Sequence, residues 1–149
     1  METESIVTRL RDASLGFLSV SGSLSLADAL DDAKARFPCA YVVTPTDRAE
    51  PNRTQGRHRQ RVTSRVAIVI GVKADAASLS GAKDRLGQFK RSVIDNLTGW
   101  RPDTADTALD YASSDLRAIA GGIVWYEVAF QCAWTLTVAE PDAPASAAV

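Results

Sequence analysis

The segment that decides the fold is Arg57-His58-Arg59-Gln60-Arg61-Val62-Thr63-Ser64-Arg65-Val66-Ala67-Ile68-Val69-Ile70-Gly71-Val72, which is basic in its first half and almost wholly apolar in its second. At a period of two residues it predicts a β-strand. One face of this strand carries Val62, Val66, Ile68, Ile70 and Val72, and the other carries Arg61, Thr63 and Arg65. The pattern indicates that the apolar second half of the strand covers a core and that the basic first half lies at a surface.

The residues before this strand predict a long basic loop. Between positions 46 and 60 the chain contains Pro51 and Gly56 and shows no periodicity. Compact domains rarely keep loops of this length without a use for them. Six arginines lie in and just after the loop, namely Arg48, Arg53, Arg57, Arg59, Arg61 and Arg65.

Composition bounds the size and class of the protein. The chain has 149 residues, of which 46% are hydrophobic and 23% charged, which is enough for one core and too little for two. We therefore expect a single domain over residues 1–138 and a disordered Ala/Pro-rich tail over residues 139–149. The formal net charge of −1 gives no global reason to bind nucleic acid or an anionic membrane, so the basic loop is a local feature.

Three segments have helical periodicity. From Thr3, apolar residues recur as far as Phe17, and a second helix opens at Ser25 with Asp28 three residues later, as in a capping box, and stops before Pro38. The third helix, with a start at Asp75 or Ser78, has the cleanest apolar stripe: Leu79, Ala82, Leu86, Phe89, Val93 and Leu97. Gly99 then stands where a left-handed helix cap belongs.

Alternating patterns predict further strands over residues 40–44, 108–112, 116–120 and 123–138. The even-numbered face of the last strand must be core. We expect a three-residue turn over residues 120–122, because that register would bury Leu116 beside Tyr126. The predicted fold class is α/β of the α+β type, a mixed or largely antiparallel sheet of about five to six strands with three helices packed on it.

Catalytic and metal-binding patterns are weak. His58 is the only histidine and lies among arginines, which favours a surface residue over a catalytic one. Asp103, Asp106 and Asp110 lack the spacing of a calcium loop, and Asp103 suits a turn. Cys39 and Cys132 have no CxxC partner, which indicates buried thiols in a reducing cytoplasm. We predict no enzyme, no cofactor and no metal.

No export signal or membrane span is predicted either. The amino-terminal residues lack the basic segment followed by an apolar segment that marks a secretory signal. The longest apolar stretch, residues 123–130, is interrupted by Glu127 and is too short to cross a bilayer.

Two interpretations of the arginines remain besides solubility. They could neutralise phosphates, as in a small nucleic-acid-binding module that uses the Arg48–Arg65 basic loop, or they could pair with carboxylates of a neighbouring protein. The lack of interleaved aromatic residues favours protein. On the last strand, Trp125 shares a face with Glu127 and Gln131, a composition typical of an interface; the alternative is a tryptophan covered by Arg117 or by a loop.

The order of several short segments resembles the tail terminator, or tail completion, proteins of tailed bacteriophages and prophages. These segments are Pro51-Asn52-Arg53, Arg59-Gln60-Arg61-Val62-Thr63, Thr98-Gly99-Trp100-Arg101-Pro102 and Gly122-Ile123-Val124-Trp125-Tyr126-Glu127-Val128-Ala129-Phe130. The resemblance runs from the first helix to about residue 136. The sequence departs from the family pattern at Ser64, where an acid is common, and at Val66, where an aromatic residue is common.

The resemblance implies a structural subunit that caps the tail tube as a hexameric ring, stops tube polymerisation and provides the head-tail joining interface. The implied partners are further copies of the chain in a homohexamer, the tail tube protein, the head-tail connector protein and, if the tail is contractile, the sheath protein. No membrane and no sequence-specific nucleic acid is expected. The implied location is the virion, after synthesis in the bacterial cytoplasm. The residues predicted to contact a neighbouring subunit or the tube are Arg53, Arg57, Arg59, Arg61, Arg65 and Trp125.

Overall fold

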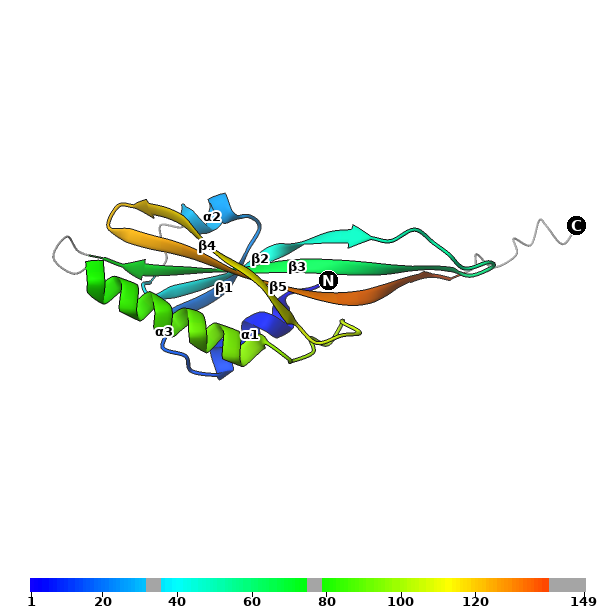
Figure 1. Ribbon diagram of the computed structural model, residues 1–149, viewed down its shortest axis with the longest axis horizontal. Coiled ribbons are helices and arrows are strands. Elements are labelled where there is room, and N and C mark those ends of the chain that lie inside the picture. Colours follow the sequence, from blue (N-terminus) through cyan, green and yellow to red (C-terminus); the bar gives the residue numbers. More distant parts are fainter. Residues whose placement is uncertain (32–35, 75–78, 140–149) are drawn as a thin grey trace, which may run out of the picture.

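A computed structural model describes residues 1–31, 36–74 and 79–139, and its centre is a pair of long antiparallel strands. The elements follow in the order α1 (Glu4–Asp12), β1 (Ser19–Ser23), α2 (Leu26–Leu30), β2 (Cys39–Ala49), β3 (His58–Lys73), α3 (Leu79–Leu97), β4 (Asp110–Ala120) and β5 (Ile123–Val138). Strands β3 and β5 have 16 residues each and pair from one end to the other (Figure 1).

The sheet has five strands in the order β1-β2-β3-β5-β4. Only β1 and β2 pair in parallel; the other three pairings are antiparallel. The five-stranded mixed sheet with three helices confirms the predicted α+β fold.

Helices cover the two faces of the sheet unequally. Helices α1 and α3 lie on one face, where Leu10 and Val93 pack with Ile68 and Phe130 in the main core. On the opposite face, α2 packs on a smaller cluster formed by Ala29, Cys39, Tyr41, Val69 and Trp125. Figure 1 shows the sheet running between α2 and the other two helices. The apolar half of β3 is therefore buried on both faces, which explains why its alternation fades after Val66.

The local helix signals are largely confirmed. The Ser25 side chain accepts a hydrogen bond from the backbone N–H of Asp28, as the capping pattern predicts. Gly99 has a φ of +83°, the left-handed conformation that ends many helices. Helix α1 ends at Asp12, short of the predicted extent to Phe17, because Ser14 and Gly16 turn the chain at positive φ. Residues 32–35 of the second predicted helix, Asp75 and Ser78 at the predicted start of the third, and the predicted tail from residue 140 lie outside the described residues.

Arg9 ties α1 to the end of α3. Its Nε donates a hydrogen bond of 2.9 Å to the carbonyl oxygen of Asn96. Its guanidinium lies 4.8 Å from the centre of the Trp100 ring, close enough for a cation–π contact. This contact holds the two helices of the main layer together at one end.

Two strand predictions were wrong. The predicted loop over residues 46–60 is shorter in the structure and covers residues 50–57, since β2 continues to Ala49 and β3 begins at His58. The predicted strands 108–112 and 116–120 form the single strand β4, whose register on β5 shifts at Ala112 and again at Arg117. Bulges of this kind leave one residue unpaired and disturb the alternation that sequence reading relies on.

The β4–β5 hairpin was predicted with the wrong turn length. Ala120 pairs with Ile123, so the turn has two residues, Gly121 and Gly122, both at positive φ. The bulge at Arg117 nevertheless restores the predicted pairing of Leu116 with Tyr126. Leu116 is not buried there: it lies on an edge strand with half of its surface exposed, at 50%.

Candidate functional site: a basic arm

Three strands continue beyond the helices and form an elongated arm. We define the arm as residues 46–65 of the β2–β3 hairpin together with residues 131–138 of β5. Within it Thr46 pairs with Arg65, Ala49 with Val62, and His58 with Val138. Figure 1 shows this part of the sheet extending well past α1 and α3. The arginine-rich segment is thus an ordered extension of the central strands.

Polar side chains from all three strands meet on one face at the base of the arm. We call this cluster of Asp47, Ser64 and Trp134 the polar joint. Ser64 is fully buried, and its Oγ donates a hydrogen bond of 2.5 Å to Oδ1 of Asp47. The same Oγ accepts a hydrogen bond of 2.8 Å from Nε1 of Trp134. The amino terminus lies 3.8 Å from the other oxygen of Asp47. These contacts connect all three strands where the arm leaves the body.

Sequence reasoning missed this joint, although the signal was present. The period of two that places Val62 and Val66 on the core face also places Ser64 between them. A hydroxyl in an apolar stripe needs a hydrogen-bond partner once it is buried. The identity of those partners depends on the register of β2 and β5.

We expect Ser64→Ala to lower the free energy of unfolding by about 1–3 kcal/mol, because the indole N–H of Trp134 and the Asp47 carboxylate each lose a hydrogen-bond partner at this partly buried joint. Denaturant unfolding measures this change. Ser113→Ala, which removes an exposed serine hydroxyl bonded to Arg65, is the matched control and should change stability by less than about 0.5 kcal/mol. Equal effects of the two substitutions would contradict a structural role for the joint.

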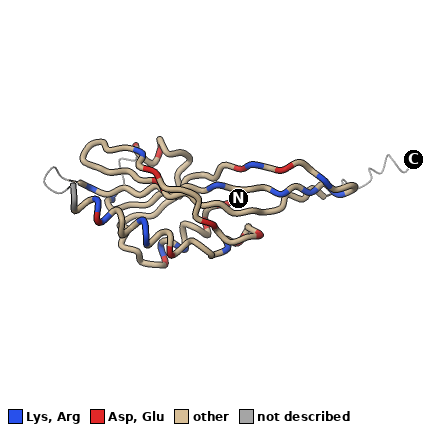
Figure 2. The backbone as a smooth tube through the Cα atoms, viewed as in Figure 1, with Lys and Arg blue, Asp and Glu red and all other residues tan. Residues whose placement is uncertain are grey.

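The other face of the arm carries the arginines. Arg59, Arg61 and Arg65 alternate along β3, and Arg57 and Arg53 lie in the connection at the tip. Figure 2 shows basic residues recurring along the arm. Within residues 1–31, 36–74 and 79–139, no carboxylate forms an ion pair with Arg53, Arg57, Arg59 or Arg61. Their guanidinium groups are exposed and available to a partner.

The tip that carries these arginines is held by its own hydrogen bonds. The Asn52 side-chain oxygen accepts from the backbone N–H of Thr54 at 3.3 Å and of Arg59 at 3.2 Å. The Thr54 hydroxyl donates to the carbonyl oxygen of Arg57 at 2.7 Å. Gly56 adopts a φ of +86°, which suits glycine. The turn therefore presents Arg57 and Arg59 from a defined backbone.

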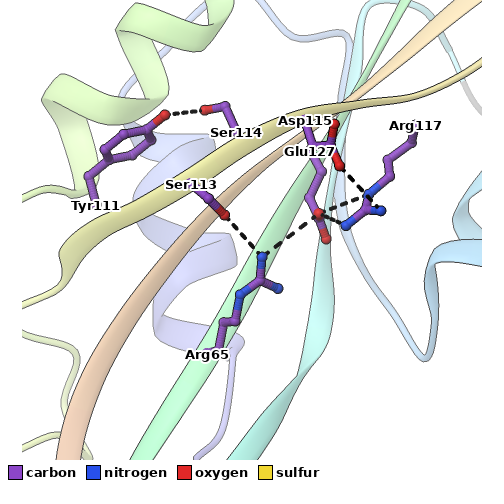
Figure 3. A network of polar contacts seen from close by, with 7 residues as sticks. All are labelled: Arg65, Tyr111, Ser113, Ser114, Asp115, Arg117 and Glu127. Atoms are coloured by element: carbon purple, nitrogen blue, oxygen red, sulfur yellow. Dashed lines mark hydrogen bonds and ion pairs between the residues drawn. The ribbon is translucent and has the colours of Figure 1, made fainter.

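Arg65 differs from the other arginines because it is already bound within the subunit (Figure 3). Its Nη2 donates to the Ser113 hydroxyl at 3.1 Å and lies 4.0 Å from Oε2 of Glu127. Glu127 is buried and also accepts hydrogen bonds from Arg117, whose Nε lies at 2.9 Å. The hydrogen bond to Glu127 raises the pKa of Arg117 above its ordinary value. This cluster, which sequence reasoning did not identify, fixes Arg65 across strands β3, β5 and β4.

Trp125 was predicted to lie on a partly solvent-exposed docking face. In the structure this face of β5 is buried at Trp125, so the predicted exposure was wrong. Only 3% of Trp125 is exposed. The ring of Phe37 meets it edge-on, with the ring centres 5.6 Å apart and an angle of 74°, and Tyr41 lies 6.4 Å away. Phe37, in the segment before β2, covers the Trp125 ring. This agrees with the alternative prediction, a tryptophan covered by a loop. The odd-numbered face of β5 is buried here because α2 and this segment pack on it.

The residues considered for chemistry are separate from one another. His58 is exposed and shares a hydrogen bond of 2.6 Å with the Gln60 side chain. Asp103 lies in a turn, as predicted, and Asp106 accepts a hydrogen bond from Thr135 at 2.7 Å. Among the described residues, no cluster of three or more His, Cys, Asp or Glu side chains could hold a metal ion. No helix in the described part of the chain has the length and apolarity needed to cross a membrane.

Both cysteines are buried, as the sequence predicts. Burial raises the pKa of the Cys132 thiol, so less of it is thiolate at neutral pH. We expect Cys39 and Cys132 to resist a water-soluble maleimide in the folded protein and to react once it is unfolded, as measured by mass. An added thiol at the exposed position of Ala120→Cys should react at once. Labelling of Cys132 at the same rate as that thiol would contradict the burial.

Comparisons with known proteins identify the family and a solved structure of the same fold. The family described as "Phage tail terminator protein" matches residues 1–140. A chain in a solved structure titled "Virion of native gene transfer agent (GTA) particle" has the same fold, with a TM-score of 0.60, 14% identity, and coverage of 87% of this chain and 90% of that chain. A search of curated proteins finds no match. Since the family match spans nearly the whole sequence, the chain belongs to the phage tail terminator family.

Proposed function

We propose that this chain caps the phage tail tube as a hexameric ring, stops tube polymerisation and provides the surface to which the head is joined. The family match makes the chain a structural protein of a phage tail. One feature of the molecule supports the proposed role as a ring that caps the tube. The arm arginines Arg53, Arg57, Arg59 and Arg61 have no ion-pair partner within the described residues, on a structured arm that extends beyond the core.

A ring places specific demands on its subunit. A head-to-tail contact closes into a ring only if each subunit carries two different and complementary surfaces. The arm is well suited to be one of them, because guanidinium groups bind carboxylates through paired hydrogen bonds. Its contacts are to a neighbouring copy of the chain or to the tail tube protein. Arg53, Arg57, Arg59 and Arg61 belong to this interface, whereas Trp125 is buried within the subunit and Arg65 is bound there by Ser113 and Glu127.

The proposed partners follow from that position in the particle. They are the tail tube protein on one side of the ring, the head-tail connector protein on the other, and the sheath protein if the tail is contractile. The chain is made in the bacterial cytoplasm and ends in the virion.

Electron microscopy of particles assembled without this chain tests the proposal. Without a cap, tube growth continues and the head has no joining surface, so we expect overlong tubes without heads. Supplying the natural chain in trans should restore tails of normal length. Normal tails and intact virions without the chain would refute the proposal.

A further inference from the structure

A groove lies between α1 and the end of α3, on the opposite side of the sheet from the arm arginines. It has a volume of about 750 Å³, a size that in other proteins holds a small ligand or a few side chains. Its wall carries four carboxylates, Glu2, Glu4, Asp12 and Asp103. We call this feature the acidic groove.

The groove acids have no counterion in the described part of the subunit. Within residues 1–31, 36–74 and 79–139, none of the four carboxylates forms an ion pair. Arg9 is the one arginine in the groove lining, and it is already engaged by the Asn96 carbonyl and the Trp100 ring. Asn96 also lines the groove, and its buried Oδ1 receives no hydrogen bond from the described residues. The groove is therefore a negatively charged surface.

Charge is thus separated within a nearly neutral molecule. The formal net charge of the chain is −1, yet residues 46–65 hold six arginines against two acids, Asp47 and Glu50. The acidic groove holds four acids against one arginine. Two unpaired surfaces of opposite sign on one subunit are what a head-to-tail contact between identical copies requires.

The geometry prevents a subunit from filling its own groove. The β3 arginines have odd numbers and leave the sheet on the face that Val69 shares with α2. The groove is built on α1 and α3, which pack on the even-numbered face with Ile68. An arm arginine can therefore reach an acidic groove only on another molecule.

We propose that the acidic groove receives the arginine-bearing arm of the next copy of this chain. The inference rests on the proposed ring and names the surface that closes it. Arg57 and Arg59 at the tip pair with Glu4 and Asp103 of the next copy. Contacts of this kind between exposed charges weaken as salt rises.

Charge reversal provides the test. The arm variant carries Arg57→Glu and Arg59→Glu, and the groove variant carries Glu4→Arg and Asp103→Arg. Sedimentation at low salt measures the association of each full-length chain. Each variant alone should associate roughly 100-fold more weakly than the natural chain, since like charges then face each other. An equimolar mixture of the two variants should regain association, because each reversed arm then meets a reversed groove.

Two matched controls accompany this test. Lys83→Glu with Arg85→Glu reverses two exposed charges on α3 outside the groove and should leave association unchanged. A chain with Arg59→Cys and Asp103→Cys should form a ladder of intermolecular disulfides on mild oxidation, since both native cysteines are buried. The same chain with Lys83→Cys in place of Asp103→Cys should not.

Other outcomes would overturn the inference. If the groove variant associates as the natural chain does, or if the mixture stays dissociated, the groove is not where the arm binds. If the natural chain does not associate and the Arg59→Cys, Asp103→Cys chain forms no ladder, the arm serves another partner. The same conclusion follows if the arm variant loses only binding to a DNA oligonucleotide. The proposed capping role survives each of these results, because it fails only when tails made without the chain have normal length.

Discussion

Phe130→Ala is expected to lower the free energy of unfolding by about 3–5 kcal/mol, the largest effect of any single substitution considered for this chain. Phe130 is fully buried in the middle of β5, where it pairs with Val66 on one side and Tyr111 on the other. The Tyr111 ring meets it edge-on at 6.2 Å. Its removal leaves a cavity beneath α1 and α3 that surrounding residues can only partly fill.

Denaturant unfolding of the two chains measures the difference. A loss of this size is a large part of the roughly 5–15 kcal/mol that stabilises an ordinary domain. Ile119→Ala is the matched control, since that side chain is 62% exposed on the edge strand β4. It should cost less than about 0.5 kcal/mol. A small effect at Phe130 would contradict the central position of this residue in the core.

Gly71→Ala is expected to destabilise the protein by about 1–3 kcal/mol, although it adds a single methyl group. A Cβ at this position would lie 2.7 Å from Cζ3 of Trp125, 2.9 Å from Sγ of Cys39 and 3.0 Å from Cε1 of Phe37. The first of these contacts is far inside van der Waals distance, and the three neighbours pack against one another. The substitution must therefore displace the ring that fills the cluster under α2.

Gly87→Ala tests the same chemical change where there is space. Gly87 lies inside α3, and a Cβ there would meet nothing within 4 Å. Alanine is the better helix former, so this variant should be more stable by about 0.5–1 kcal/mol. Thermal or denaturant unfolding of both variants should show opposite signs. Destabilisation by both would mean that the loss at Gly71 does not come from crowding.

Much of the fold could be predicted from sequence because its determinants are local or periodic. The even face of β3, the stripe on α3 and the cap at Ser25 each follow from the spacing of a few neighbouring residues. The β4–β5 hairpin was found because Gly121 and Gly122 permit its turn. The family resemblance rested on several such segments in order, and the family match over residues 1–140 confirms it.

The parts that sequence reading missed depend on contacts between distant segments. The end of β2, residues 46–49, was taken for part of a loop because it has no apolar alternation where helices no longer cover the strand. Trp125 was placed at a surface because nothing near it in sequence indicates that Phe37 and α2 cover it. The buried Ser64 joint and the Glu127 cluster likewise require knowledge of which strands are neighbours.

The uninterrupted pairing of β3 with β5 bears on how the subunit carries mechanical load. Antiparallel strands bond at right angles to their length, so tension applied to the tip along the strands strains many of these bonds in shear at the same moment. Peeling, in which bonds break one after another, needs far less force. Force applied at the tip of the arm would thus be transmitted along β3 and β5 to the part of the sheet that is buried in the core.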